Sequence, residues 1–122
     1  MLFHTIFVTI FAMSNVSGTN EVVVFITAPT DEEAALIAKS LVESKLAACV
    51  NIIRSIRSIY LWQGKIEDDT EVLMIVKTRK ELFEQLSSRV KELHSYDVPE
   101  IIALPIITGS EDYLKWLRDS TI

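Results

Sequence analysis

Residues 21–33 read EVVVFITAPTDEE, and this stretch predicts a strand together with the helix that follows it. The run 22–26 is apolar throughout and mostly β-branched, which is typical of a buried strand. Pro29 ends the run, and Thr30 stands three residues before Glu33 in the pattern of a helix-capping box. The segment therefore predicts a strand over 21–27 and a helix that begins after Thr30 and ends near Ser44.

The same device recurs in residues 71–81, EVLMIVKTRKE, where an apolar run precedes a second capping box formed by Thr78 and Glu81. The apolar spacing that follows predicts a second helix with an inner face ending at Leu93. Between the two copies, residues 46–62 predict a long strand bent near Arg54. The interruption at 63–65, which contains Gly64, makes that strand one arm of a hairpin.

After Pro99, residues 101–104 predict a fourth strand, and Ser110 is placed to cap a last helix. This order predicts an α+β fold, the ferredoxin-like split βαβ sandwich (βαββαβ plus a C-terminal helix), with an antiparallel sheet and both crossover helices on one face. Residues 73–76 are apolar at consecutive positions, so the other face of the sheet is also apolar. We therefore expect that face to be buried against further copies of the chain.

Composition excludes several classes of protein. The chain has 122 residues, enough for one domain, and a formal charge of −5, which argues against a nucleic-acid partner. Its three glycines are isolated, so no glycine-rich phosphate loop is present. A single cysteine excludes an internal disulfide framework, and two histidines are too few for a closed zinc site built from Cys and His.

Residues 1–20 contain no Asp, Glu, Lys or Arg, which sets this apolar N-terminal extension apart from a domain over 21–122. The extension has the length of a secretory signal core or a weak anchor, but it lacks a positive leading region. A floppy tail and initiation at Met13 are the alternatives. Localisation stays open between the cytoplasm, which the free thiol of Cys49 favours, and a secretory or membrane-associated site if residues 1–20 act as a signal or anchor.

Five segments carry a resemblance to a known family: KLAACVN (45–51), IYLWQGKIE (59–67), EVLMIVKT (71–78), HSYDVPE (94–100) and YLKW (113–116). In order and spacing they resemble the divalent-cation tolerance protein family, CutA. The resemblance implies a compact homotrimer of ferredoxin-like subunits. It also implies a role in tolerance to copper and other divalent ions and, in animal members, in anchoring acetylcholinesterase at membranes. Neither role is an enzymatic activity.

His94 and Cys49 are the candidate metal ligands. A neutral imidazole suits copper or zinc and a thiolate selects Cu(I), whereas the alternatives are a helix C-terminal contact for His94 and core packing for Cys49. Some bacterial relatives carry a cysteine in the first strand and a second histidine, and here Ile26 and Leu93 stand there. The acidic run 67–71 is interpreted as a solvated turn.

Five further residues match positions that recur in the family and are expected to line a cleft between subunits: Tyr60, Trp62, Lys77, Tyr96 and Glu100. The alternative is structural, with aromatic rings packed at an interface and an ion pair between Lys77 and Glu100. No Ser or Cys stands in a recognisable arrangement with a base, so we expect no enzyme. The leading hypothesis is a trimeric divalent-metal, chiefly copper, binding protein. The rivals are a small-molecule sensor similar to the PII proteins and a trimeric scaffold.

Overall fold

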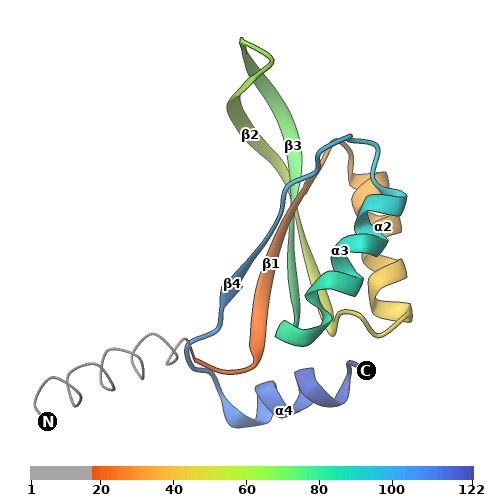
Figure 1. Ribbon diagram of the computed structural model, residues 1–122, viewed down its shortest axis with the longest axis vertical. Coiled ribbons are helices and arrows are strands. Elements are labelled where there is room, and N and C mark those ends of the chain that lie inside the picture. The colour runs from red at the N-terminus through yellow and green to blue at the C-terminus, as the bar shows by residue number, and fades with distance from the viewer. Residues whose placement is uncertain (1–17) are drawn as a thin grey trace, which may run out of the picture.

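The computed structural model describes residues 18–122, which form a four-stranded antiparallel sheet in the order β2-β3-β1-β4 and three α-helices. The elements are β1 (Glu21–Ala28), α2 (Asp31–Glu43), β2 (Cys49–Trp62), β3 (Lys65–Arg79), the 3₁₀ turn η1 (Lys80–Leu82), α3 (Phe83–Leu93), β4 (Ile101–Pro105) and α4 (Glu111–Asp119). Helices α2 and α3 cover one face of the sheet, and α4 lies across one end (Figure 1). The predicted ferredoxin-like βαββαβ arrangement with a C-terminal helix is confirmed.

The two predicted capping boxes have different outcomes. Thr30 caps α2 as expected, because its Oγ1 accepts a hydrogen bond from the Glu33 amide at 3.1 Å. The second box is wrong, since Thr78 lies inside β3, paired with Val22, and its hydroxyl donates to the carbonyl of Leu46 at 2.6 Å. Pairing with β1 carries the strand one residue past Thr78, so the helix enters through η1 without a side-chain cap.

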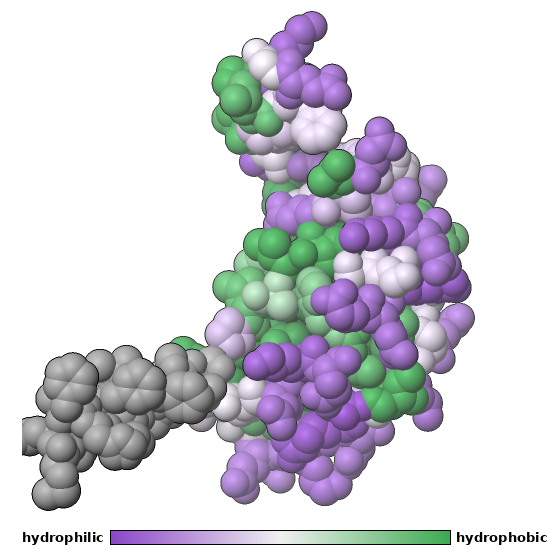
Figure 2. Space-filling view, in the orientation of Figure 1, coloured by the Kyte–Doolittle hydropathy of each residue, from purple (hydrophilic) through white to green (hydrophobic). Residues whose placement is uncertain are grey.

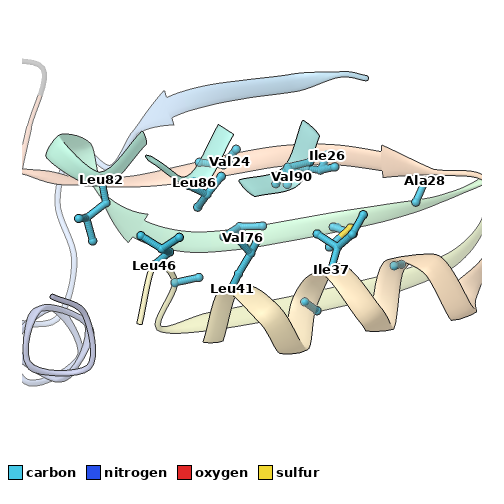
Figure 3. Close-up of a cluster of buried hydrophobic side chains, with 14 of the residues drawn as sticks. Val24, Ile26, Ala28, Ile37, Leu41, Leu46, Val76, Leu82, Leu86 and Val90 are labelled. Carbon is cyan, nitrogen blue, oxygen red and sulfur yellow. The ribbon is translucent and has the colours of Figure 1, made fainter. Parts of the chain in front are cut away.

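The hydrophobic core lies between the sheet and helices α2 and α3. Even-numbered residues of β1, and those of β3 from Val72 to Thr78, point toward the helices and are almost wholly buried, as strand alternation requires. Figure 3 shows the helix side chains that meet them. The core includes Val24, Ile26, Met74 and Val76 from the sheet, and Ile37, Leu41, Leu86 and Val90 from the helices.

The opposite face of the sheet has no helix over it and is apolar. Phe25, Ile75 and Ile102 stand side by side across β3, β1 and β4, and Ile102 is 51% exposed. Figure 2 shows hydrophobic surface over this middle part of the molecule. The apolar character predicted for this face is confirmed. We call it the helix-free face below.

The β2–β3 hairpin extends well beyond the sheet (Figure 1). A register shift between Ile53 and Ile56 marks its base, and Ser55 there has φ 61°. This irregularity is the bend predicted near Arg54. Gln63 (φ 51°) and Gly64 (φ 79°) close the tip, where a tight hairpin turn requires positive φ at both central residues.

Residues 1–17 lie outside the described part of the chain, so the extension expected over 1–20 stays a prediction. Thr19, close to the start of the described residues, contacts the chain just after β4, since its amide donates to the carbonyl of Ile106 at 2.9 Å. No helix within residues 18–122 has the length and apolarity to cross a membrane.

Candidate functional site

A cavity of about 820 Å³ lies between the projecting hairpin and the segment that joins α3 to β4. Four of the five predicted cleft residues line it: Tyr60 and Trp62 from β2, and Tyr96 and Glu100 from the connecting segment. The bend at the base of the hairpin positions the two β2 rings, and Pro99, which ends the connection before β4, restricts the backbone beside Glu100. The structure therefore brings together residues far apart in the sequence, such as Tyr60 and Tyr96, which are 36 positions apart.

Lys77 does not belong to this cavity. It lies opposite Cys49 on β2 and Val23 on β1, and its Nζ donates a hydrogen bond to Oδ1 of Asn51. Within residues 18–122 it forms no ion pair with Glu100, so the ion pair that the sequence suggested is absent within a single copy of the chain.

Two tyrosine hydroxyls in the cavity are held by carboxylates. Tyr96 Oη donates to Glu71 Oε2 at 2.8 Å, and Tyr60 Oη donates to Asp69 Oδ2 at 2.7 Å. Burial, followed by the hydrogen bond to Glu71, raises the pKa of Tyr96, and the hydrogen bond to Asp69 raises the pKa of Tyr60 to about 12. Both phenols therefore remain protonated donors at neutral pH.

Glu71 is the residue that sequence reasoning missed. The acidic run was interpreted as a solvated turn, but Glu71 is only 5% exposed and lines the cavity. That interpretation is wrong for Glu71 because β3 already pairs with β2 at this point, opposite Ile56. The spacing of two residues between Glu71, Leu73 and Ile75 is the signal in the sequence that indicates a strand position for Glu71 instead of a turn.

His94 directly follows α3, at the start of the segment that joins α3 to β4. Its side chain is 0% exposed, Nδ1 accepts from the Tyr96 amide at 3.0 Å, and Nε2 lies 2.7 Å from the carbonyl of Thr27. Because Nδ1 accepts a hydrogen bond from the Tyr96 amide, Nε2 is assigned as the nitrogen that donates, to the Thr27 carbonyl. Glu33 supports the same segment by accepting from the amide and hydroxyl of Ser95, both at 3.1 Å. Both ring nitrogens of His94 are thus engaged, and a metal ion would have to replace one of these bonds.

Cys49 lies far along the sheet from His94. It is half-buried and lies near Tyr113 of α4, whose pKa is raised chiefly by burial. Cys49 pairs with Lys77 of β3, which pairs in turn with Val23 of β1. His94 instead contacts Thr27, four residues further along β1. Among residues 18–122, no three His, Cys, Asp or Glu side chains are grouped to hold a metal ion. The described residues of a single copy do not fit a metal site.

Comparison with known proteins identifies the family. The family model described as CutA1 divalent ion tolerance protein matches residues 22–120. The chain belongs to the CutA1 divalent ion tolerance family. The resemblance inferred from the five sequence segments is thereby confirmed. The CutA1 family is named for ion tolerance and not for a chemical reaction.

Relatives of this CutA1 chain occur in bacteria and plants. The divalent-cation tolerance protein CutA of Thermus thermophilus is 55% identical over 101 residues, covering 83% of this chain and 98% of the relative. The chloroplastic protein CutA of Arabidopsis thaliana is 52% identical over 100 residues, or 82% of this chain. This chain spans only 55% of the plant relative.

Solved structures of CutA1 proteins share the fold. The structure of the divalent cation tolerance protein from T. thermophilus superimposes with a TM-score of 0.82 at 55% identity, covering 84% of this chain and 99% of that one. CutA1 from Oryza sativa gives a TM-score of 0.83 at 47% identity, covering 87% and 97%.

Proposed function

We propose that this CutA1 chain acts in divalent-cation tolerance as a homotrimer that binds divalent ions, copper among them. The helix-free face carries the proposal. Its apolar residues, which include Phe25, Ile75 and Ile102, form a continuous surface across three strands. Apolar surfaces of this kind mark interaction sites, and a second copy of the same chain presents the same surface.

Assembly also bears on ion binding, because one copy lacks a complete ligand set. The carboxylates of Glu71, Asp97 and Glu100 line the cavity and supply the oxygen atoms that hard divalent ions prefer. Cys49 supplies a soft thiol for Cu(I), at a separate place on the sheet. A neighbouring copy would have to complete either site, so ion binding is expected to depend on the assembled form.

Light scattering and calorimetry test the proposal together. The full chain is expected to have the mass of three copies and to release or absorb heat on titration with Cu²⁺ or Zn²⁺. Cys49→Ser and Glu100→Gln separate the two ligand types, because the first removes the thiol and the second removes one cavity carboxylate. A single-copy mass with no metal heat would contradict the proposal.

The cavity volume favours a second candidate, a small-molecule sensor similar to the PII proteins. About 820 Å³ is far more space than a single ion occupies and lies within the range of small-molecule sites. Heat on titration with a nucleotide in the absence of metal would support this candidate. A trimer that binds neither would leave the scaffold hypothesis. The acetylcholinesterase partner expected from the resemblance stays a prediction, tested by co-precipitation from membranes.

A further inference from the structure

The geometry points to a ligand of another class for the cavity: an organic cation, with a primary ammonium group on an apolar body and Glu71 as its counter-ion. This ligand differs in class from the divalent ions proposed above, does not require them, and would compete with them for the same carboxylates. Three observations carry the inference: a buried carboxylate without a cationic partner, an excess of negative charge, and aromatic walls.

Glu71 is the first observation. It is 5% exposed and lines the cavity, and Oε2 accepts from the Tyr96 hydroxyl. No Lys, Arg or His within residues 18–122 forms an ion pair with it. A carboxylate removed from water is costly unless a cation or several donors compensate it. Since the phenol supplies a single neutral donor, a cationic group from a ligand would complete the site.

The charge of the lining is the second observation. Glu71, Asp97 and Glu100 contribute three carboxylates, and Arg57 is the only basic side chain from the described residues that lines the cavity. Arg57 is already used, because Nε and Nη2 donate to the two carboxylate oxygens of Asp68 at 2.8 and 2.6 Å. The cavity therefore favours cations, and an anionic nucleotide would meet repulsion.

The aromatic walls are the third observation. Tyr60, Trp62 and Tyr96 line the same space, and ring faces attract organic cations while their edges pack against apolar groups. The Tyr60 hydroxyl donates to Asp69 and the Tyr96 hydroxyl donates to Glu71, so the rings and the carboxylates share one region. A primary ammonium suits this arrangement, since its N–H groups donate to Glu71 while its apolar body contacts the rings.

A matched pair of probes tests the role of charge. The full chain at pH 7 is titrated with benzylammonium and, separately, with benzyl alcohol, which has nearly the same shape and no charge. We expect benzylammonium to bind and benzyl alcohol to bind at least about tenfold more weakly, the effect of losing a charge-assisted hydrogen bond. Equal affinities, or no binding of either probe, would overturn the inference.

Variants then assign the counter-ion. Glu71→Gln retains an acceptor for Tyr96 and removes the charge, so it is expected to lower the affinity for benzylammonium about tenfold or more and to leave benzyl alcohol unchanged. Glu84→Gln makes the same charge change at an exposed position on α3 and is expected to have no effect. Unchanged benzylammonium affinity in Glu71→Gln overturns the inference.

The mass of the variant excludes a purely structural role. If Glu71→Gln alters the mass measured by light scattering, Glu71 pairs between copies and the inference is overturned. If the variant does not fold, Trp62→Leu, at a side chain 45% exposed, replaces it and is expected to weaken benzylammonium binding. Full affinity in Trp62→Leu would then overturn the inference. Metal titration of the wild-type chain is a separate readout, so failure of the divalent-ion proposal is distinguishable from failure of this one.

Discussion

Replacing His94 tests whether this residue serves structure or metal binding. In His94→Ala the imidazole disappears from a position that is 0% exposed. The change removes the bond from Nε2 to the carbonyl of Thr27 (2.7 Å) and the bond from the Tyr96 amide to Nδ1 (3.0 Å). We expect a large loss of stability, because two backbone groups lose partners and a space is left where the ring was.

The magnitude follows from these contacts. Each lost hydrogen bond contributes about 1 kcal/mol net, and more where the remaining group stays away from water. The imidazole also packs against the Tyr96 ring, with 4.8 Å between the ring centroids, so the space left by its removal adds a further penalty of about 1 kcal/mol. We therefore expect the free energy of unfolding to fall by roughly 2–4 kcal/mol.

Urea unfolding followed by tryptophan fluorescence measures this loss. Because an assembling protein gains stability with concentration, wild type and variant are compared at several equal concentrations. Cys49→Ser, at a half-buried site without such bonds, is the control and is expected to change the free energy by less than about 1 kcal/mol. A loss below about 0.5 kcal/mol in His94→Ala, together with abolished copper heat, would refute the structural assignment and restore His94 as a ligand.

Three other predictions follow from the helix-free face, the tyrosines and the C-terminal helix. Ile75→Lys places a charge at the centre of the helix-free face, so the mass by light scattering is expected to fall toward one copy, and an unchanged mass would contradict burial of that face. Alkaline titration followed by tyrosinate absorbance is expected to show Tyr60 ionising near pH 12 instead of 10, and ionisation at pH 10 in the folded protein would contradict this. Because Tyr60 in the unfolded chain ionises at the lower pH, its contribution to stability is retained below pH 10 and is lost as the pH rises to about 12. Arg118→Ala leaves the 2% exposed carboxylate of Glu21 without its partner at 2.9 Å and is expected to lower the free energy of unfolding in urea by about 2 kcal/mol or more. Lys115→Ala, in a pair exposed on both sides, is the control and is expected to lower it by less than about 1 kcal/mol; equal losses would refute the importance of burial.

Local patterns predicted the elements well, and their failures have a physical cause. Thr30 caps α2 because a cap needs only residues three positions apart. Thr78 shows the same local pattern, but pairing with Val22 draws it into the sheet and its hydroxyl turns to Leu46. Pairing with the distant strand β1 outcompeted helix capping at Thr78, and the residues around Thr78 do not indicate that pairing.

The candidate site divides in the same way. Tyr60, Trp62, Tyr96 and Glu100 line one cavity within a single copy, whereas Lys77 lies elsewhere on the sheet, and the cleft that was expected between copies stays a prediction. That expectation came from the family resemblance, because no periodicity relates a hairpin to a loop after a later helix.

By itself, the sequence determined the order of strands and helices, the apolar character of both sheet faces and the family, since these depend on the spacing of residue types along the chain. Only the tertiary structure decided that Glu71 is buried against Tyr96, 25 positions away, and that both nitrogens of His94 are engaged. The reason is that burial and hydrogen bonding depend on which distant segments the fold brings within about 3 Å, a distance that neighbouring residues do not specify.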